Sequence, residues 1–473
     1  MALLWKTHIP AAVTFTVIAC SFSPVLAGEN QQLLRDSIPA TWTYESKQTT
    51  TLPSDDRWWE GFDDPVLTSL IRRGEENSFN LSMAAHRIEM ARQNWELAKA
   101  AYYPNLGISA GWTKELQSGM TGREAMKAMG ADYFSLGLNF SWEIDVFGRV
   151  REQSKEGKAN YNASKAEYSA AMISLCSNIA TAYFNYRLAQ GRVDVAKRQI
   201  TSQERISKIT QARYETGLAS KLDVSQSLTV LYSTQATLPA LNNMQTAALN
   251  SIALLIGCYP DDIRSELAGE RELPNAFRMV KIGVPADMIR RRPDILEAEQ
   301  QLAVYAAQAG IAKKDFLPTL SLTGSVGTSA HKINDLFSKE SFTYSIAPQL
   351  SWTIFEGMAR NRRLAAAKEQ MLAGIDNYNL AVMNAVIETE NALSAYDTSL
   401  QQIALFRKVL NESRESFTLA VDRYKRGLSA FTDVMSAQIN MLEYENTLLE
   451  TRASALSSLV KVYAAVAGSP IEE

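Results

Sequence analysis

The chain has 473 residues, of which 46% are hydrophobic, and a formal net charge of -3 at pH 7. It carries no polybasic excess, so its composition excludes a nucleic acid held by charge. Beyond the N-terminus no run of about 18 apolar residues occurs, which excludes helical membrane spans. The apolar residues must therefore be buried by helix packing or in a barrel.

The N-terminus predicts a secretory signal, because Lys6 precedes an apolar run from Ile9 to Cys20. Two cleavage sites compete. The residues before Cys20 resemble a lipobox, which would remove residues 1–19 and place a covalent lipid on Cys20, whereas Val25–Ala27 resembles an ordinary site with cleavage after Ala27. We favour the lipobox, and expect an exported protein with an extended segment over 20–64.

An internal repeat organises the chain. The segment ARYETGLASKLDV, residues 212–224, recurs as DRYKRGLSAFTDV, residues 422–434, at an offset of 210 residues. Two shorter echoes are SWEI at 141–144 against SWTI at 351–354, and AKAAYYPNL at 98–106 against AKKDFLPTL at 312–320.

The repeat divides the chain into two homologous halves, 65–257 and 286–468. The linker between them, 258–285, loses helical periodicity and gathers proline and glycine. A short tail over 469–473 follows the second half. We expect both halves to have the same architecture.

Each half predicts the order helix, strand, strand, helix, helix. Apolar residues recur every three or four positions from about Pro65 to Ala101, which predicts one helix that stops before Pro104. The second half restarts at Pro293, a residue suited to the first turn of a helix. After Pro104 the period becomes two, which is typical of a strand. Strands are expected at about 104–114, 133–143, 318–328 and 342–352.

These strands have the length and pattern of membrane-spanning barrel strands, with one apolar face, one small or polar face and aromatic ends. The alternative is a soluble β-hairpin on a helical body. Four strands cannot close a barrel, and lipid forbids open sheet edges, so several copies must pool their strands. An oligomer follows, with the number of subunits left open.

Two stretches of almost 70 residues, 150–216 and 358–426, lack proline. At 1.5 Å per residue each could form a helix of roughly 100 Å, and their spaced apolar residues require long antiparallel partner helices. The RYxxGL segments supply glycine as a C-terminal stop, and the helical pattern resumes after Asp223 and Asp433. Each segment is therefore expected to be the tip of a helical hairpin.

Taken together, these features resemble the TolC-type outer-membrane efflux factors, in particular their lipoprotein branch, over essentially all of the mature sequence. The matching features are Cys20 with Pro24, the RRPDI stretch at 291–295, the two strand pairs and the two RYxxGLxxxxDV tips. The family's tyrosine- and proline-rich stretch after the lipidated cysteine is weak here, which leaves lipidation open but not the fold.

The resemblance implies a mainly α fold with a membrane β-barrel. Three copies would form a homotrimer whose twelve strands close one barrel, continuous with a long α-helical tunnel across the periplasm. It also implies a lipid-anchored protein in the outer membrane, with a periplasmic adaptor protein and an inner-membrane efflux pump as partners.

The sequence offers no residues for catalysis. It has no Walker loop, GxSxG elbow, HExxH motif or dinucleotide fingerprint, so we expect no enzyme, and no cofactor beyond the lipid on Cys20. His86 and His331 have no second histidine or cysteine at metal spacing, so no metal site is expected. Cys176 and Cys258 lie in apolar helical patterns and are expected to be buried thiols rather than a bridge.

Four residues near the tips are candidates for a periplasmic gate. Tyr214 and Tyr424 resemble the positions at which the family holds this gate closed by hydrogen bonds, with buried packing as the alternative. If the tips converge in a trimer, Asp223 and Asp433 would place six carboxylates around one opening, a ring that favours cations. Alternatively, each aspartate caps the returning helix.

Two further groups of residues are candidates for contacts outside the chain. The tip glycines and the leucines that follow them resemble adaptor-docking tips, with a plain turn and a self-buried leucine as the alternative. Two tryptophans near strand ends are expected at the level of the lipid headgroups. These residues are Gly217, Leu218, Gly427 and Leu428 at the tips, and Trp142 and Trp352 at the strands.

We therefore expect the outer-membrane exit duct of a tripartite efflux system. Substrate handed over by the pump would enter at the tips, the helices would untwist to widen the opening, and diffusion through the barrel would complete export. The rival is a structural or adhesive periplasm-spanning protein, which would not need regular strand pairs. An enzyme would require a polar cluster that the sequence lacks. Selectivity in such systems resides largely in the pump, so the sequence names no transported compound.

Overall fold

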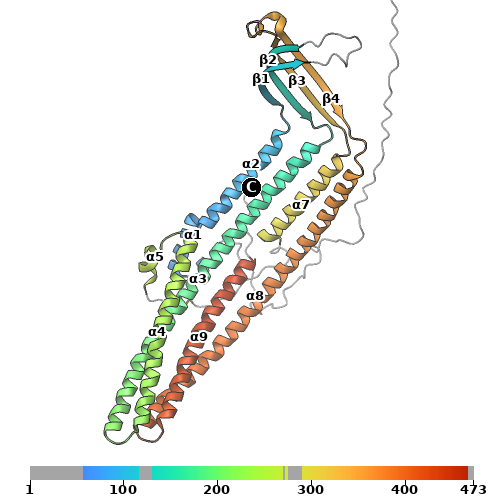
Figure 1. Ribbon diagram of the computed structural model, residues 1–473. Coiled ribbons are helices and arrows are strands. Elements are labelled where there is room, and N and C mark those ends of the chain that lie inside the picture. The colour runs from blue at the N-terminus through green and yellow to red at the C-terminus, as the bar shows by residue number, and fades with distance from the viewer. Residues whose placement is uncertain (1–56, 117–129, 270–271, 275–289, 467–473) are drawn as a thin grey trace, which may run out of the picture.

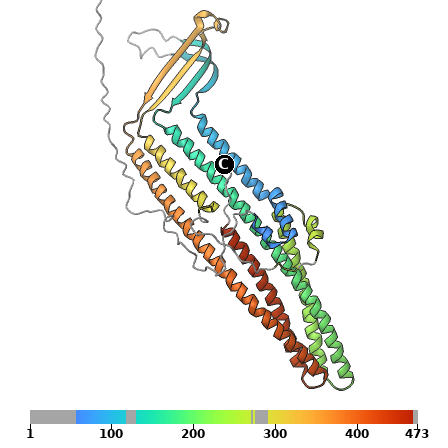
Figure 2. The same ribbon diagram turned by 180° about the vertical axis from the view of Figure 1, so that it is seen from behind.

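The computed structural model describes residues 57–116, 130–269, 272–274 and 290–466, and shows a long helical body with a small sheet at one end (Figure 1). The two helical tips lie together at the opposite end (Figures 1 and 2). Cys20, both predicted cleavage sites and the C-terminal tail lie outside the described residues. None of the helices in the described ranges is long and apolar enough to cross a membrane.

Both halves contain the predicted order of elements. The first half has α1 (Pro65–Asn77), α2 (Phe79–Ala100), β1 (Asn105–Leu116), β2 (Gly130–Ile144), α3 (Arg149–Glu215) and α4 (Lys221–Ile256). The second half has α7 (Pro293–Lys314), β3 (Thr319–Ala330), β4 (Phe342–Ser351), α8 (Ala359–Lys425) and α9 (Phe431–Val466). Shorter helices are η2 (Trp58–Phe62), α5 (Pro260–Leu267), η3 (Ile333–Asp335) and η4 (Lys339–Ser341).

The prediction of one helix from Pro65 to Ala101 is wrong, because the chain breaks at Ser78 into α1 and α2. Ser78 is extended, with φ −65° and ψ 123°, and its amide closes α1 by donating to the carbonyl oxygen of Gly74. The end of α4 crosses this break, since a β-carbon at Gly257 would collide with the carbonyl oxygen of Asn77. The break lets α1 pack on α3 and α4 while α2 continues toward the sheet.

The linker also contains a helix that its composition did not suggest. Pro260 occupies the first turn of α5, and the carboxylate of Asp262 accepts a hydrogen bond from the amide of Tyr259 at 3.1 Å. Ile263 and Leu267 are fully buried against the main core. Proline and acidic residues here start a helix rather than prevent one.

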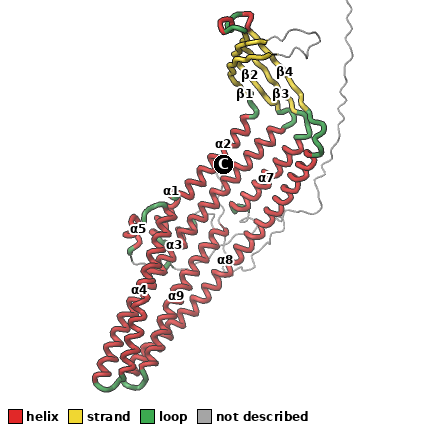
Figure 3. The backbone as a smooth tube through the Cα atoms, in the orientation of Figure 1, coloured by secondary structure: helices red, strands yellow, loops and turns green. Residues whose placement is uncertain are grey.

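The four strands form one antiparallel sheet in the order β1-β2-β3-β4 (Figure 3). The two halves meet between β2 and β3, where Trp142 pairs with Leu322. Strands β1 and β4 each have one free edge in the protomer. The sheet therefore does not close on itself and has two unpaired edge strands in the protomer.

The helices lie side by side in two tiers. Toward the sheet α3 packs against α2 and α7, and toward the tips it packs against α4 and α9. The predicted long helices are confirmed, because α3 and α8 have 67 residues each. The main core lies between the tiers, where Leu67, Leu70 and Ile71 of α1 pack on α3. Burial of each such side chain contributes about 1.5–3 kcal/mol.

Candidate functional site

The two tips have the conformation that the repeated RYxxGL segments predict. Gly217 and Gly427 have φ values of 77° and 76°, which only glycine adopts without strain. The amide of Leu218 donates to the carbonyl oxygen of Arg213 at 2.7 Å, and the amide of Leu428 donates to that of Arg423 at 2.9 Å. Each glycine therefore stops its long helix, as predicted.

The leucines that follow these glycines point away from their own turns. Leu218 is 66% exposed and Leu428 is 64% exposed. A plain turn with a self-buried leucine is therefore wrong for the protomer. Each tip therefore presents a leucine that the described chain leaves largely exposed.

The returning helix α4 begins two residues before Asp223, not after it as expected. The Oγ atom of Ser220 accepts a hydrogen bond from the amide of Asp223 at 3.1 Å, and the carboxylate of Asp223 accepts one from the amide of Ser220 at 2.9 Å. This capping box supports the capping role of Asp223. In the second tip the position of Ser220 is taken by Ala430, whose methyl group cannot accept a hydrogen bond.

The two tip tyrosines differ in their surroundings. Tyr424 is 5% exposed, and its ring packs edge-on against Phe431 at 5.6 Å between centroids. Tyr214 is 40% exposed, and the ammonium of Lys221 lies 5.8 Å from its ring centroid. Within one protomer, buried packing therefore describes Tyr424 but not Tyr214.

Arg213 joins the two tips, a role that the sequence analysis missed. Its guanidinium donates to the carbonyl oxygen of Lys425 at 2.9 Å and to that of Leu218 at 3.3 Å. It also lies 4.9 Å from the ring centroid of Tyr424. The arginine of the repeated RYxxGL motif was a visible signal, since it occurs in both tips.

At the other end of the molecule, the sheet has two chemically distinct faces. One face carries large apolar side chains in register, such as Ile108 beside Leu138 and Val326 beside Tyr344. The opposite face carries glycine, serine, threonine and amide side chains, such as Asn139 beside Ser325. An apolar face for lipid and a polar face for water are what a barrel wall requires.

The two predicted interface tryptophans occupy equivalent places at the base of the sheet. The indole nitrogen of Trp352 donates to the carbonyl oxygen of Phe316 at 3.0 Å, and Trp142 makes the matching contact with Tyr102. Next to Trp142, the Glu143 carboxylate accepts two hydrogen bonds from the Arg149 Nη2 atom at 2.8 and 2.9 Å. Hydrogen bonding to Glu143 raises the pKa of the Arg149 guanidinium.

A buried network of hydrogen bonds connects the start of α1, the middle of α3 and the linker. Tyr183 donates to the carboxylate of Asp64 at 2.5 Å, and Arg187 donates to the Tyr183 hydroxyl at 3.1 Å. Arg187 also donates to the carbonyl oxygen of Gly269 at 2.7 Å. Burial, together with the hydrogen bond to Asp64, raises the pKa of Tyr183 to about 12.

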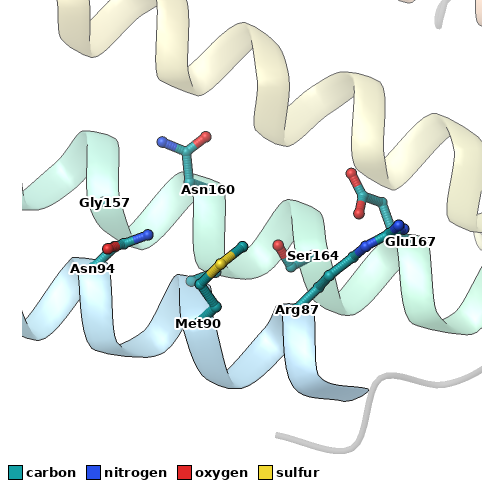
Figure 4. Close-up of a pocket in the computed structure, with 8 residues that line it drawn as sticks. Arg87, Met90, Asn94, Gly157, Asn160, Ser164 and Glu167 are labelled. Atoms are coloured by element: carbon teal, nitrogen blue, oxygen red, sulfur yellow. The ribbon is translucent and has the colours of Figure 1, made fainter. Parts of the chain in front are cut away.

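Between α2 and α3 lies a half-open hollow of about 230 Å³ (Figure 4). Gly157 lines the hollow and also lets α3 pack closely on α2, because a β-carbon there would lie 3.1 Å from the Cα atom of Trp95. Among the described residues no group of three or more histidine, cysteine or acidic side chains could hold a metal ion. The hollow is a gap between packed helices with mixed lining, namely Arg87, Met90, Ala91, Asn94, Gly157, Asn160, Ser164 and Glu167.

A sheet with one apolar and one polar face, carried on long helical hairpins that turn at Gly217 and Gly427, defines a membrane channel protein with a helical extension. The protein belongs to the outer membrane efflux protein family, whose model matches residues 70–258 and 284–468. It is accordingly an outer-membrane protein of efflux, with the helix-and-barrel fold of the TolC-type channels.

Known relatives agree with this assignment over nearly the whole chain. The solvent efflux pump outer membrane protein SrpC of Pseudomonas putida is 29% identical over 86% of each chain. The cation efflux system protein CusC of Escherichia coli is 26% identical over 97% of this chain and 98% of its own. The solved outer-membrane channel OprN superposes with a TM-score of 0.85 at 27% identity, covering 94% of this chain and 99% of its own. The open-state channel MtrE of Neisseria gonorrhoeae superposes with a TM-score of 0.79 at 26% identity, covering 93% and 97%.

Proposed function

We propose that the protein is the passive exit duct of a tripartite efflux system, and that it works as a homotrimer. The observation that carries this proposal is the open four-stranded sheet on paired hairpins. Its apolar face suits lipid, but the free edges of β1 and β4 do not, so lipid requires them to be paired. Four strands from each of three subunits would close a twelve-stranded barrel.

Equivalent positions of the two halves support closure through the helices as well. Val195 on α3 is 2% exposed beneath its neighbours, whereas its repeat counterpart Leu405 on α8 is 61% exposed. Val304 on α7 is 3% exposed, whereas its counterpart Met90 on α2 is 60% exposed. In the protomer, α3 packs against α7 and α9. If a second copy placed its α2 and α4 beside α8 in the same way, the exposed side chains would be buried.

The exposed leucines at the tips favour contact with a partner protein over contact with solvent. Leu218 and Leu428 are exposed beside tight turns, and such apolar residues mark interaction surfaces when they gather in an assembly. We assign them, with Gly217 and Gly427, to a periplasmic adaptor protein that links the duct to an inner-membrane pump. The relatives are named for different solutes, solvents in one case and cations in the other, so the likeness does not single out one transported compound.

The four gate residues and the lipid on Cys20 remain part of this proposal. Tyr214 and Tyr424 would hold the tips together, and Asp223 and Asp433 would form a ring of carboxylates at the opening. Asp433 is exposed in the protomer, which supports a carboxylate at the proposed opening. Replacing both aspartates with asparagine keeps their size and should weaken the preference for cations, since charge at a constriction sets ion selectivity. Mass spectrometry of the mature N-terminus decides between a lipid on Cys20 and cleavage after Ala27.

The function is tested with detergent-purified protein in a planar lipid bilayer, after native mass and electron microscopy have established the assembly. We expect threefold tubes and stepwise ionic conductance without any energy source. No catalytic cofactor or nucleic acid should be required. Tubes without conductance would favour the structural, periplasm-spanning rival, and compact monomers would contradict the barrel and the duct together.

A further inference from the structure

The contact between Arg213 and Tyr424 lies between two hairpins that are repeats of each other. Hairpin 1 is α3 with α4, and hairpin 2 is α8 with α9. Around the lower tier the helices follow the order α4, α3, α9, α8, because α3 packs on α9 while α4 and α8 lie at the outer edges. Closing this order into a ring with further copies brings α8 of one subunit against α4 of the next. That interface repeats the one between α3 and α9.

The repeat therefore supplies a counterpart for each residue of the Arg213 contact. Arg213 corresponds to Arg423 and Tyr424 corresponds to Tyr214, both at the offset of 210 residues. Within the described protomer the Arg423 guanidinium has no hydrogen bond, ion pair or ring contact. Tyr214 is eight times more exposed than Tyr424, at 40% against 5%. Both residues of the second contact are thus present, but within one protomer they do not contact each other.

We propose that Arg423 binds Tyr214 of the partner subunit, so that six arginine–tyrosine contacts, alternating within and between subunits, close the ring of tips. This inference rests on the proposed trimer. Lys221 already lies over the Tyr214 ring, in the place where Phe431 packs on Tyr424. The remaining part of the Tyr214 ring is then left for Arg423, as the corresponding part of Tyr424 is occupied by Arg213.

Charge favours the contact between subunits over the contact within one. Arg213 donates to the main-chain carbonyl oxygen of Lys425, a residue of like charge. The counterpart of Lys425 is Glu215, so Arg423 would meet a carboxylate of opposite sign beside the same carbonyl oxygen. The carboxylate of Glu215 is exposed and accepts a hydrogen bond from Gln211 at 2.9 Å. A hydrogen bond between an arginine and a carboxylate is stronger than the bonds that Arg213 makes to neutral carbonyl oxygens beside its aromatic ring.

The contact is tested by cross-linking in the full-length protein after Cys176→Ser and Cys258→Ser. Arg423→Cys with Tyr214→Cys, treated with a short bifunctional thiol reagent, should give covalent dimers and trimers on a denaturing gel. Arg213→Cys with Tyr424→Cys is the matched control, which should close within one subunit and remain monomeric. The four single-cysteine variants account for any background reaction.

Monomers alone from the first pair, in protein whose native mass is that of a trimer, would overturn the contact and leave the duct standing. A native mass of a monomer would instead remove the assembly itself. A second readout is the open probability of single channels. Arg423→Ala should raise it by about two- to fivefold per contact, and Arg423→Lys should retain part of the closure because the cation remains. An unchanged open probability in Arg423→Ala would also count against the contact.

Discussion

The indole nitrogen of Trp142 donates a hydrogen bond to the main-chain carbonyl oxygen of Tyr102 at 2.9 Å. Tyr102 lies just past the end of α2, and Trp142 lies near the end of β2, so the bond ties a helix end to the base of the sheet. Trp352 and Phe316 repeat the arrangement in the second half at 3.0 Å. Each of these tryptophans therefore ties the helical body to the sheet.

Removing this bond while keeping an aromatic ring should loosen the joint. Trp142→Phe is expected to lower the free energy of unfolding by about 1 kcal/mol, because one intramolecular hydrogen bond is lost. Trp352→Phe should cost a similar amount, and the double variant should be additive, since the two joints share no partner. The measurement is urea unfolding of the detergent-purified protein. A double variant no weaker than either single one would show that the joints act as one unit.

The buried Tyr183 makes a specific prediction about alkaline pH. Its pKa is raised from 10 to about 12 in the folded protein, so its contribution to stability is complete below pH 10 and is lost as the pH rises toward 12. For one proton the loss is at most about 1.4 kcal/mol per pH unit. Tyr183→Phe should lower stability at neutral pH but decline less steeply between pH 10 and 12.

The control for this experiment is Tyr186→Phe, which removes a neighbouring buried hydroxyl that donates to the carbonyl oxygen of Leu267 at 3.2 Å. Unfolding in urea is followed at several pH values for the three proteins. Equal slopes for the wild type and Tyr183→Phe above pH 10 would contradict the assignment.

Two glycines of the sheet should differ sharply in their tolerance of alanine. A β-carbon at Gly327 would collide with the carbonyl oxygen of Leu136 and lie 2.7 Å from the Cα atom of Gly137, whereas one at Gly107 would meet nothing within 4 Å. Gly327→Ala must push β2 and β3 apart, at a cost of about 1–3 kcal/mol. We expect less assembled protein in the outer membrane for Gly327→Ala and a normal amount for Gly107→Ala, measured by heat-dependent mobility on gels. Equal assembly of both variants would show that the sheet yields at this point.

The unequal caps of the two tips give a pair of opposite predictions. Ser220→Ala should destabilise hairpin 1 by about 1 kcal/mol, because α4 loses its capping box. Ala430→Ser places a hydroxyl before α9, three residues ahead of Asp433, and should stabilise hairpin 2 by up to about 1 kcal/mol. Hydrogen exchange of the tip amides measures both effects locally. Slower exchange in Ser220→Ala would show that the capping box does not stabilise the start of α4.

The sequence predicted those features that local chemistry determines. Three signals each concern a single element: the absence of proline over α3 and α8, the alternation in the strands, and the repeated glycines at 217 and 427. The break at Ser78 was missed because no proline or glycine marks it, and because its cause is the crossing of Gly257, far away in the chain. The α5 helix was missed for a different reason, since Pro260 was taken as a breaker although it also suits a first turn.

The residues of the candidate site also fall into those that local sequence predicts and those that depend on distant contacts. Exposed tip leucines and the helix cap at Asp223 follow from positions in a turn and were among the alternatives. The role of Arg213 depends on which helix lies beside its own, and the network of Asp64, Tyr183 and Arg187 joins residues up to 123 positions apart. Periodicity carries no information about such pairings, because many partners satisfy the same pattern.

The two halves also match in length, since α3 and α8 each have 67 residues and α4 and α9 each have 36. Hairpins of equal length bring both tips to the same end of the molecule (Figure 1), so the tube that we propose would have a level rim. An insertion of one heptad in a single hairpin would project its tip by about 10 Å beyond the others. A change in hairpin length would therefore keep this rim level only if it occurred in both halves.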